Sequence, residues 1–188
     1  MRSGPISRED AVRVRLVCFD IDGVLTDGGI YLGATDSGER VEMKRFEITD
    51  GLGIRLLQDA GIAVAIVTGR ESAAVRLRAE ELRITECHQD ATAAKLSVME
   101  KLIQRLGLAW EQVAFLGDDL ADLPVLRRAG LPAAVANAVP EVRATARWVG
   151  IRRGGQGAAR EFAEALLHAR GEWAPLVERY VEEREEGR

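Results

Sequence analysis

Short apolar runs alternate with helix-forming stretches along most of this 188-residue chain. Runs of about 4 to 8 apolar residues without a helical period are typical of strands that are buried on both faces of a parallel sheet. They lie at residues 16–19, 62–67, 113–116, 133–136 and 148–149, with a weaker run at 84–87. The alternation predicts an α/β fold, a Rossmann-like parallel sheet with helices on both faces.

Residues 29–48 depart from this alternation. Two β-rich runs flank the turn-like residues 34–38, and this pattern predicts a β-hairpin inserted after the first strand. Residues 1–14 are polar and are expected to be a loosely held lead-in, whereas the charged tail at 171–188 is compatible with a helix or an ordered arm. The length of 188 residues fits one domain of an α/β protein, and we expect a single domain over residues 1–188.

Composition excludes several classes of protein. The chain is 47% hydrophobic and 30% charged, as in ordinary globular proteins, and its formal net charge of -4 argues against a nucleic-acid partner. No apolar run approaches the length of a membrane span, and residues 1–10 lack the apolar region of a signal peptide. We therefore expect a cytoplasmic protein without a membrane partner, in which Cys18 and Cys87 are buried thiols.

Polar side chains follow three of the predicted strands. They are Asp20 and Asp22 after residues 16–19, Thr68 after 62–67, and Asp118 and Asp119 after 113–116. Because the carboxyl ends of parallel strands open on one edge, where ligands bind in α/β sheets, we expect these groups to meet. Each group alone is equally compatible with an ordinary turn, N-cap or first helical turn. Their joint occurrence at one edge favours a site.

The set suits phosphoryl transfer, which needs a nucleophile, an acid for the leaving oxygen and positive charge on the phosphoryl group. Asp20 is the predicted nucleophile, forming an aspartyl-phosphate, and Asp22 the predicted acid and base. Lys95, near the start of a strongly amphipathic helix, is predicted to neutralise phosphoryl charge, although alone it would be read as a solvated lysine. The hydroxyl of Thr68 and backbone NH groups near Gly69 are predicted to hold the phosphoryl oxygens.

Several carboxylates beside a phosphate repel one another unless a divalent cation joins them. Hard oxygen ligands without clustered His or Cys favour Mg²⁺. The predicted protein ligands are a carboxyl oxygen of Asp20, the backbone carbonyl of Asp22, and Asp118. Asp119 and Asp122 are expected to support these ligands without contacting the ion themselves.

The segments FDIDGVLTDG, VTGR and GDDLADLP, with Lys95 between the last two, resemble the motifs of the haloacid dehalogenase superfamily of phosphohydrolases. The retained Asp22 implies phosphatase rather than dehalogenase chemistry. FEITDGLGIRLL and RGGQGAAREF extend the resemblance, over about residues 14–168, to the phosphatases of 3-deoxy-D-manno-octulosonate 8-phosphate, which act in lipopolysaccharide biosynthesis. Residues 88–94 before the lysine, and Asn137, depart from the usual family pattern.

The resemblance implies a Mg²⁺-dependent phosphomonoesterase acting on a small anionic sugar phosphate. Arg70 and Arg78 match arginines of that family's pattern and are expected to contact the acidic sugar, the alternative for both being a solvated helix face. Many members of the superfamily close their sites with a cap domain, but the segments 22–68 and 95–118 are too short for one, so we expect a capless fold. The resemblance also implies that the hairpins assemble a homotetramer, in which neighbouring subunits and their carboxyl-terminal tails complete each site.

Three other functions stay open. The first is a phosphatase for the 9-phosphate of a nine-carbon sugar acid of the sialic acid type, and Arg70 favours the eight-carbon substrate over it. The second is a broader phosphatase for small metabolites. The third is a non-catalytic oligomerisation module, against which the intact Asp20, Asp22, Lys95 and Asp118 argue.

Overall fold

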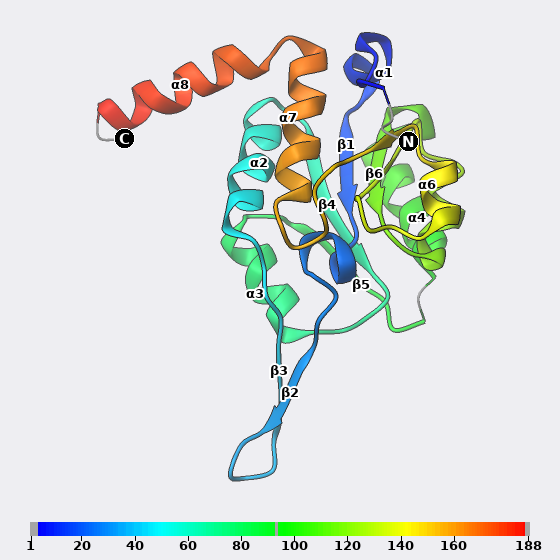
Figure 1. Ribbon diagram of the computed structural model, residues 1–188, viewed down its shortest axis with the longest axis vertical. Helices are drawn as coiled ribbons and strands as arrows, with labels where there is room; N and C mark the ends of the chain where they lie inside the picture. The colour runs from blue at the N-terminus through cyan, green and yellow to red at the C-terminus, as the bar shows by residue number, and fades with distance from the viewer. Residues whose placement is uncertain (1–3, 93, 187–188) are drawn as a thin grey trace.

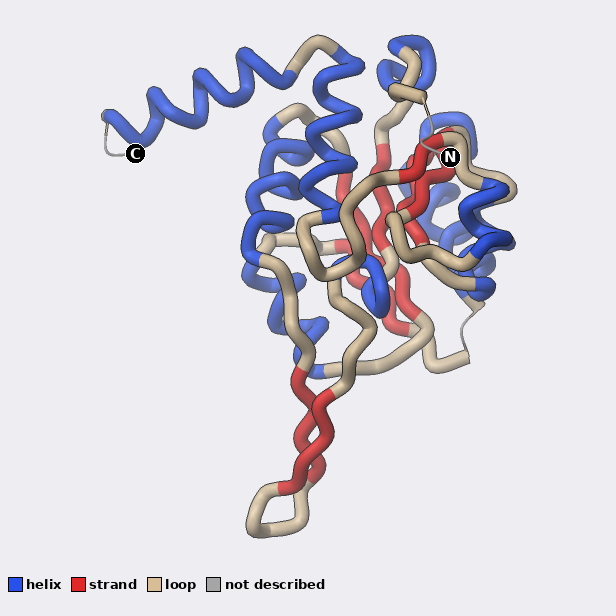
Figure 2. The backbone as a smooth tube through the Cα atoms, viewed as in Figure 1, coloured by secondary structure: helices blue, strands red, loops and turns tan. Residues whose placement is uncertain are grey.

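The computed structural model describes residues 4–92 and 94–186, and its centre is a six-stranded parallel sheet in the order β5-β4-β1-β6-β7-β8 (Figures 1 and 2). The strands are β1 Leu16–Phe19, β4 Ala63–Thr68, β5 Glu86–Gln89, β6 Val113–Gly117, β7 Leu131–Ala134 and β8 Trp148–Val149. Helices flank this sheet, so the predicted α/β fold class is confirmed.

Strand β1 lies in the middle of the sheet, and all four of its residues are buried. Its last residue, Phe19, pairs in register with Ile66 of β4 on one side and Leu116 of β6 on the other. The chain runs outward from β1 to β4 and β5 and then returns to β6 on the opposite side of β1. This reversal is a topological switch point, where open α/β sheets bind their ligands.

Helices cover the two faces of the sheet, with α2, α3 and α7 on one side and α4 and α6 on the other (Figure 1). The apolar period of α4 predicts one face formed by Leu96, Met99, Leu102, Ile103 and Leu106; the middle three are buried, and Leu96 and Leu106 are half-buried. The helices of the described residues are α1 Arg8–Arg13, α2 Ile48–Asp59, α3 Ala73–Glu81, α4 Lys95–Leu106, α5 Leu123–Leu126, α6 Pro140–Thr145, α7 Ala158–Arg170 and α8 Trp173–Glu185, with short helical turns at Ile21–Leu25, Trp110–Gln112 and Leu120–Asp122.

The expectation of a loose lead-in is wrong for the described residues 4–14. They include α1, whose N-cap Ser7 accepts a hydrogen bond from the amide of Asp10 at 3.1 Å. Ala11 is fully buried, and the guanidinium of Arg170 donates to the carbonyls of Ala11 and Val14 at 3.0 and 3.2 Å. A buried guanidinium needs acceptors, and the end of α1 supplies them.

The tail forms a helix, α8, over Trp173–Glu185 rather than an irregular arm. Helix α8 extends away from the sheet, and Leu176 is its one buried residue among those described (Figure 1). None of the helices in the described part of the chain combines the length and apolar character that crossing a membrane requires.

The antiparallel strands β2 (Tyr31–Ala34) and β3 (Arg40–Met43) form a hairpin that projects from the body of the molecule (Figure 2). It lies within the predicted segment 29–48. Tyr31 pairs with Met43, and these side chains are 55% and 59% exposed, beside Leu32 at 63%. The hairpin therefore presents apolar surface to the outside of the chain.

Candidate active site

A cavity of about 230 Å³ opens at the carboxyl edge of β1, β4 and β6. It is lined by all the predicted site residues except Asp122 and Arg78, together with Ala121. The lining residues come from three strand ends and from Lys95 at the start of α4, segments that are far apart in sequence. The structure thus brings the predicted polar groups together at the switch point of the sheet.

Asp20 follows β1 directly and is 4% exposed. The ammonium of Lys95 lies 2.7 Å from Oδ1 of Asp20 and 2.7 Å from Oδ1 of Asp122. Burial, and then the charge of Asp122, raise the pKa of Asp20 to about 7, while Lys95 opposes both. Burial alone would lower the pKa of Lys95, but the two carboxylates raise it above its ordinary value, so the ammonium stays charged.

Asp122 is fully buried, and both of its carboxylate oxygens are occupied. Oδ1 accepts from Lys95, and Oδ2 accepts from the backbone amides of Asp118 and Asp119 at 2.9 and 3.3 Å. Asp122 therefore ties the loop after β6 to α4. Its part is to hold Lys95 and Asp118 in place rather than to offer a free ligand atom.

The carboxyl group of Asp118 has one unpaired oxygen among the described residues. Its Oδ1 is buried and has no hydrogen-bond partner among the described residues. Burial and the charges of Asp20 and Asp122 raise the pKa of Asp118 to about 8. Carboxylate oxygens of these three residues lie within 4.8 Å of one another. A hard divalent cation fits such a donor set, and because Asp122 is already occupied, Asp20 and Asp118 are the carboxylates left to bind it.

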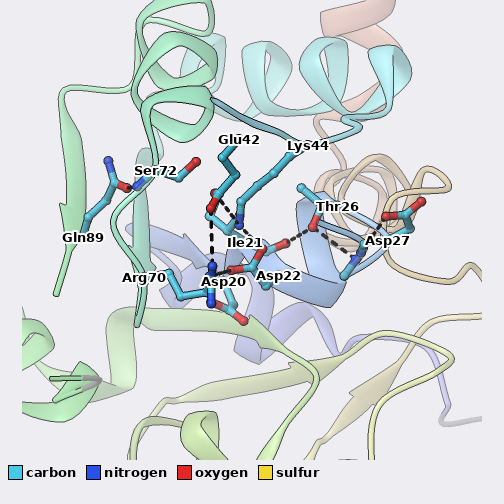
Figure 3. A network of polar contacts seen from close by, with 12 residues as sticks. Asp20, Ile21, Asp22, Thr26, Asp27, Glu42, Lys44, Arg70, Ser72 and Gln89 are labelled. Carbon is cyan, nitrogen blue, oxygen red and sulfur yellow. Dashed lines mark hydrogen bonds and ion pairs between the residues drawn. The ribbon is translucent and has the colours of Figure 1, made fainter. Parts of the chain in front are cut away.

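Asp22 contacts a lysine that the sequence interpretation missed. The ammonium of Lys44 donates to Oδ1 of Asp22, and Nε of Arg70 lies 3.8 Å from Oδ2 (Figure 3). The Lys44 side chain is fully buried even though it follows the projecting strand β3. One signal could have identified it: the sequence contains only three lysines among its 26 basic residues, and the other two are Lys95 and Lys101.

The turn that carries the two aspartates needs glycine at position 23. Gly23 has a φ of +91°, and a Cβ there would lie 2.1 Å from Oδ2 of Asp118. The loop at 152–157 then packs onto this turn so closely that a Cβ on Gly154 would lie 1.7 Å from the carbonyl oxygen of Gly23. The amide of Gly154 donates to Oδ1 of Asn137 at 2.8 Å. The glycines of RGGQG therefore hold the aspartate turn from outside, with the help of Asn137.

Thr68 ends β4, is buried, and lines the cavity with Gly69 and Arg70. Arg78 lies elsewhere. Its guanidinium donates to the carbonyl of Glu47 at 3.1 Å and lies 5.7 Å from the ring centroid of Phe46. With a side chain only 11% exposed, Arg78 is not on a solvated helix face, and its contact with substrate stays a prediction.

Comparison with known proteins agrees with this geometry. Residues 88–160 match the family described as haloacid dehalogenase-like hydrolase. The chain is 43% identical to 3-deoxy-D-manno-octulosonate 8-phosphate phosphatase KdsC of Escherichia coli (strain K12). The 171 aligned residues cover 89% of this chain and 88% of that protein.

Two solved structures extend the comparison. A probable YrbI family phosphatase from Pseudomonas syringae has a TM-score of 0.85 and 44% identity, covering 93% of this chain and 96% of that one. The 3-deoxy-D-manno-octulosonate 8-phosphate phosphatase of Moraxella catarrhalis, solved with a magnesium ion, a phosphate ion and a KDO molecule, also has a TM-score of 0.85, with 36% identity over 92% of this chain and 97% of that one.

Proposed function

The chain belongs to the 3-deoxy-D-manno-octulosonate 8-phosphate phosphatases of the haloacid dehalogenase-like hydrolases, and from this premise we propose that it hydrolyses 3-deoxy-D-manno-octulosonate 8-phosphate to the sugar acid and phosphate with Mg²⁺. The observation that carries the proposal is the convergence of Asp20, Asp22, Lys95 and Asp118 in one cavity at the switch point. Arg70 lines the same cavity, which suits an acidic sugar.

Each step has a residue of this chain to perform it. The carboxylate of Asp20 attacks phosphorus, a bond forms between them, and the bond from phosphorus to the sugar oxygen breaks. Asp22 gives its proton to that leaving oxygen. Asp22 then takes a proton from the water that attacks the aspartyl-phosphate, which releases phosphate and restores Asp20. Lys95 stabilises the phosphoryl charge, and the hydroxyl of Thr68 donates to a phosphoryl oxygen.

Mg²⁺ fits the site because the buried Oδ1 of Asp118 has no partner among the described residues and a second carboxylate lies close by. We propose that Asp20, Asp118 and the backbone carbonyl of Asp22 hold the ion. When bound, it supplies positive charge that offsets these carboxylates and the phosphate. Asp119 and Asp122 support the loop that carries Asp118.

Phosphate release from a panel of sugar phosphates tests the function. With Mg²⁺ present, the panel compares the eight-carbon 8-phosphate with nine-carbon sugar acid 9-phosphates and with neutral hexose phosphates. We expect the highest kcat/KM for the eight-carbon ester. A higher value for a nine-carbon ester would assign the chain to the related phosphatases, equal values would indicate a broad phosphatase, and no release from any ester would support a non-catalytic module.

We also propose a cytoplasmic location. The support is chemical: Cys18 and Cys87 are both free thiols, one buried and one half-buried, as suits a reducing compartment. The expectation of no signal peptide rests on residues that include 1–3, which lie outside the described residues.

The assembly that we propose is a homotetramer built on the hairpins. An isolated two-stranded hairpin is only marginally stable in water, and this one exposes Tyr31, Leu32 and Met43. Packing against hairpins of other copies would cover these side chains and the strand edges. The same packing would place neighbouring chains near a site that has no cap.

Replacing Tyr31 and Met43 together by Asp should therefore dissociate the assembly and lower sugar phosphate turnover at least about 10-fold, because packing the hairpins together would bury unpaired carboxylates. The unfolding midpoint of the domain should change little. Light scattering measures the assembly, phosphate release the turnover, and thermal unfolding the midpoint. The control is Leu77→Asp, which charges an apolar residue on α3 that is 66% exposed, slightly more than Tyr31 or Met43. A wild-type chain that is monomeric and fully active at assay concentration would remove the proposal.

A further inference from the structure

Four charged side chains of alternating sign form a closed ring beside the cavity (Figure 3). Lys44 contacts Asp22, and its ammonium lies 3.9 Å from Oε1 of Glu42. Nη2 of Arg70 donates to Oε2 of Glu42 at 3.4 Å, and Nε of Arg70 returns to Asp22 at 3.8 Å. Glu42 and Lys44 come from the hairpin, whereas Asp22 and Arg70 follow β1 and β4. The hairpin thus reaches the predicted acid and base directly.

Within this ring Lys44 is the fully buried member, and Arg70 is 45% exposed. A buried ammonium is stable only when carboxylates pair with it, and here Asp22 and Glu42 do so. The contact is specific to one oxygen. Lys44 donates to Oδ1 of Asp22, while Oδ2 is buried and has no hydrogen-bond partner among the described residues.

An ammonium can only donate hydrogen bonds. Lys44 therefore holds Oδ1 as a donor, and it fixes the orientation of the Asp22 carboxylate about its own side-chain torsions. Without this contact the carboxylate, which stands on a glycine-containing turn, would be free to rotate or to bond elsewhere. Arg70 does not replace Lys44, since at 3.8 Å it makes no hydrogen bond to Asp22.

We propose that Lys44 is a positioning residue for Asp22, holding its carboxylate in the orientation from which it transfers the proton to the leaving oxygen. This inference rests on the proposed function, in which Asp22 is the acid and base. It makes the hairpin a part of the catalytic machinery of its own chain, in addition to any part in assembly.

The leaving group tests this role. A sugar alkoxide must be protonated as it leaves, whereas the phenolate of 4-nitrophenyl phosphate leaves without help. Lys44→Met preserves the volume and apolar stem of the side chain. It should lower kcat/KM for the sugar phosphate about 100-fold, within the range of general acid catalysis, and lower kcat/KM for the aryl phosphate less than about 3-fold. Lys101→Met, on the exposed side of α4, is the matched control and should change neither value.

A double-mutant cycle on the sugar phosphate gives an independent reading. If Lys44 acts through Asp22, Lys44→Met should have little further effect in an Asp22→Asn background, because coupled residues do not act additively. Losses that multiply, an equal loss for both leaving groups, or a rise in KM at constant kcat would each overturn the proposal. Should Lys44→Met not fold, Lys44→Gln carries the same comparison with a smaller loss. Failure of the wild-type chain to hydrolyse any sugar phosphate would instead overturn the proposed function.

Discussion

Asp20→Asn should abolish hydrolysis of the sugar phosphate while the fold remains intact. The substitution keeps the shape of the side chain but replaces the attacking carboxylate by an amide, so no aspartyl-phosphate can form. When catalytic residues act together, loss of the nucleophile typically lowers kcat by several orders of magnitude. We therefore expect kcat to fall about 10⁴-fold or more. Phosphate release under saturating substrate and Mg²⁺ measures it.

Stability should not fall with activity. Asp20 is buried, and burial raises its pKa to about 7, so at neutral pH its charge is already costly. A neutral amide removes that cost, although it also removes one partner of Lys95. Asp27→Asn, an exposed position on the same turn, is the control and should retain activity. Appreciable steady turnover by the Asp20→Asn variant would contradict the aspartyl-phosphate mechanism.

Removal of the metal should lower the activity almost as much as Asp20→Asn does. EDTA leaves Lys95 as the positive charge at Asp20 and removes the cation that we propose also offsets Asp118 and the phosphate. Because a bound metal contributes several kcal/mol to stabilising transition-state charge, activity should fall about 10³-fold or more and return on addition of Mg²⁺. Asp118→Ala should abolish activity at any Mg²⁺ concentration used to rescue the wild type.

The control for the metal site is Asp36→Ala, which removes a carboxylate from the exposed turn of the hairpin. It should leave the Mg²⁺ dependence unchanged. Full activity of the wild-type chain in metal-free buffer would refute the site, and so would an Asp118→Ala variant with an unaltered Mg²⁺ requirement.

The sequence was informative where a local pattern determines the structure. Apolar strands with polar ends placed Asp20, Thr68 and Asp118 at one edge, because parallel strands must open in the same direction. The amphipathic period of α4 likewise matches the face on which Met99, Leu102 and Ile103 are buried. In each case the apolar pattern lies within a few residues of the side chain whose position it predicts.

Contacts made by distant parts of the chain were not predictable in this way. Lys44 contacts Asp22 across 22 residues of chain, at the point where the hairpin rejoins the body of the protein. Such a contact leaves no periodic pattern in the sequence. Helix α1 is fixed by Arg170 from the far end of the chain. Arg78 illustrates a different case, since a family pattern named the residue, but its carbonyl and aromatic partners come from the junction before α2.

Trapping the covalent intermediate tests the central claim most directly. The wild-type chain is mixed with 3-deoxy-D-manno-octulosonate 8-phosphate and Mg²⁺, quenched within one turnover and treated with borohydride, which reduces an acyl phosphate to an alcohol. Mass spectrometry of the peptides should then show Asp20 converted to homoserine, only when the substrate was present. Release of phosphate without any change at Asp20, or conversion of a different carboxylate, would contradict the assignment of this sheet edge as the phosphatase active site.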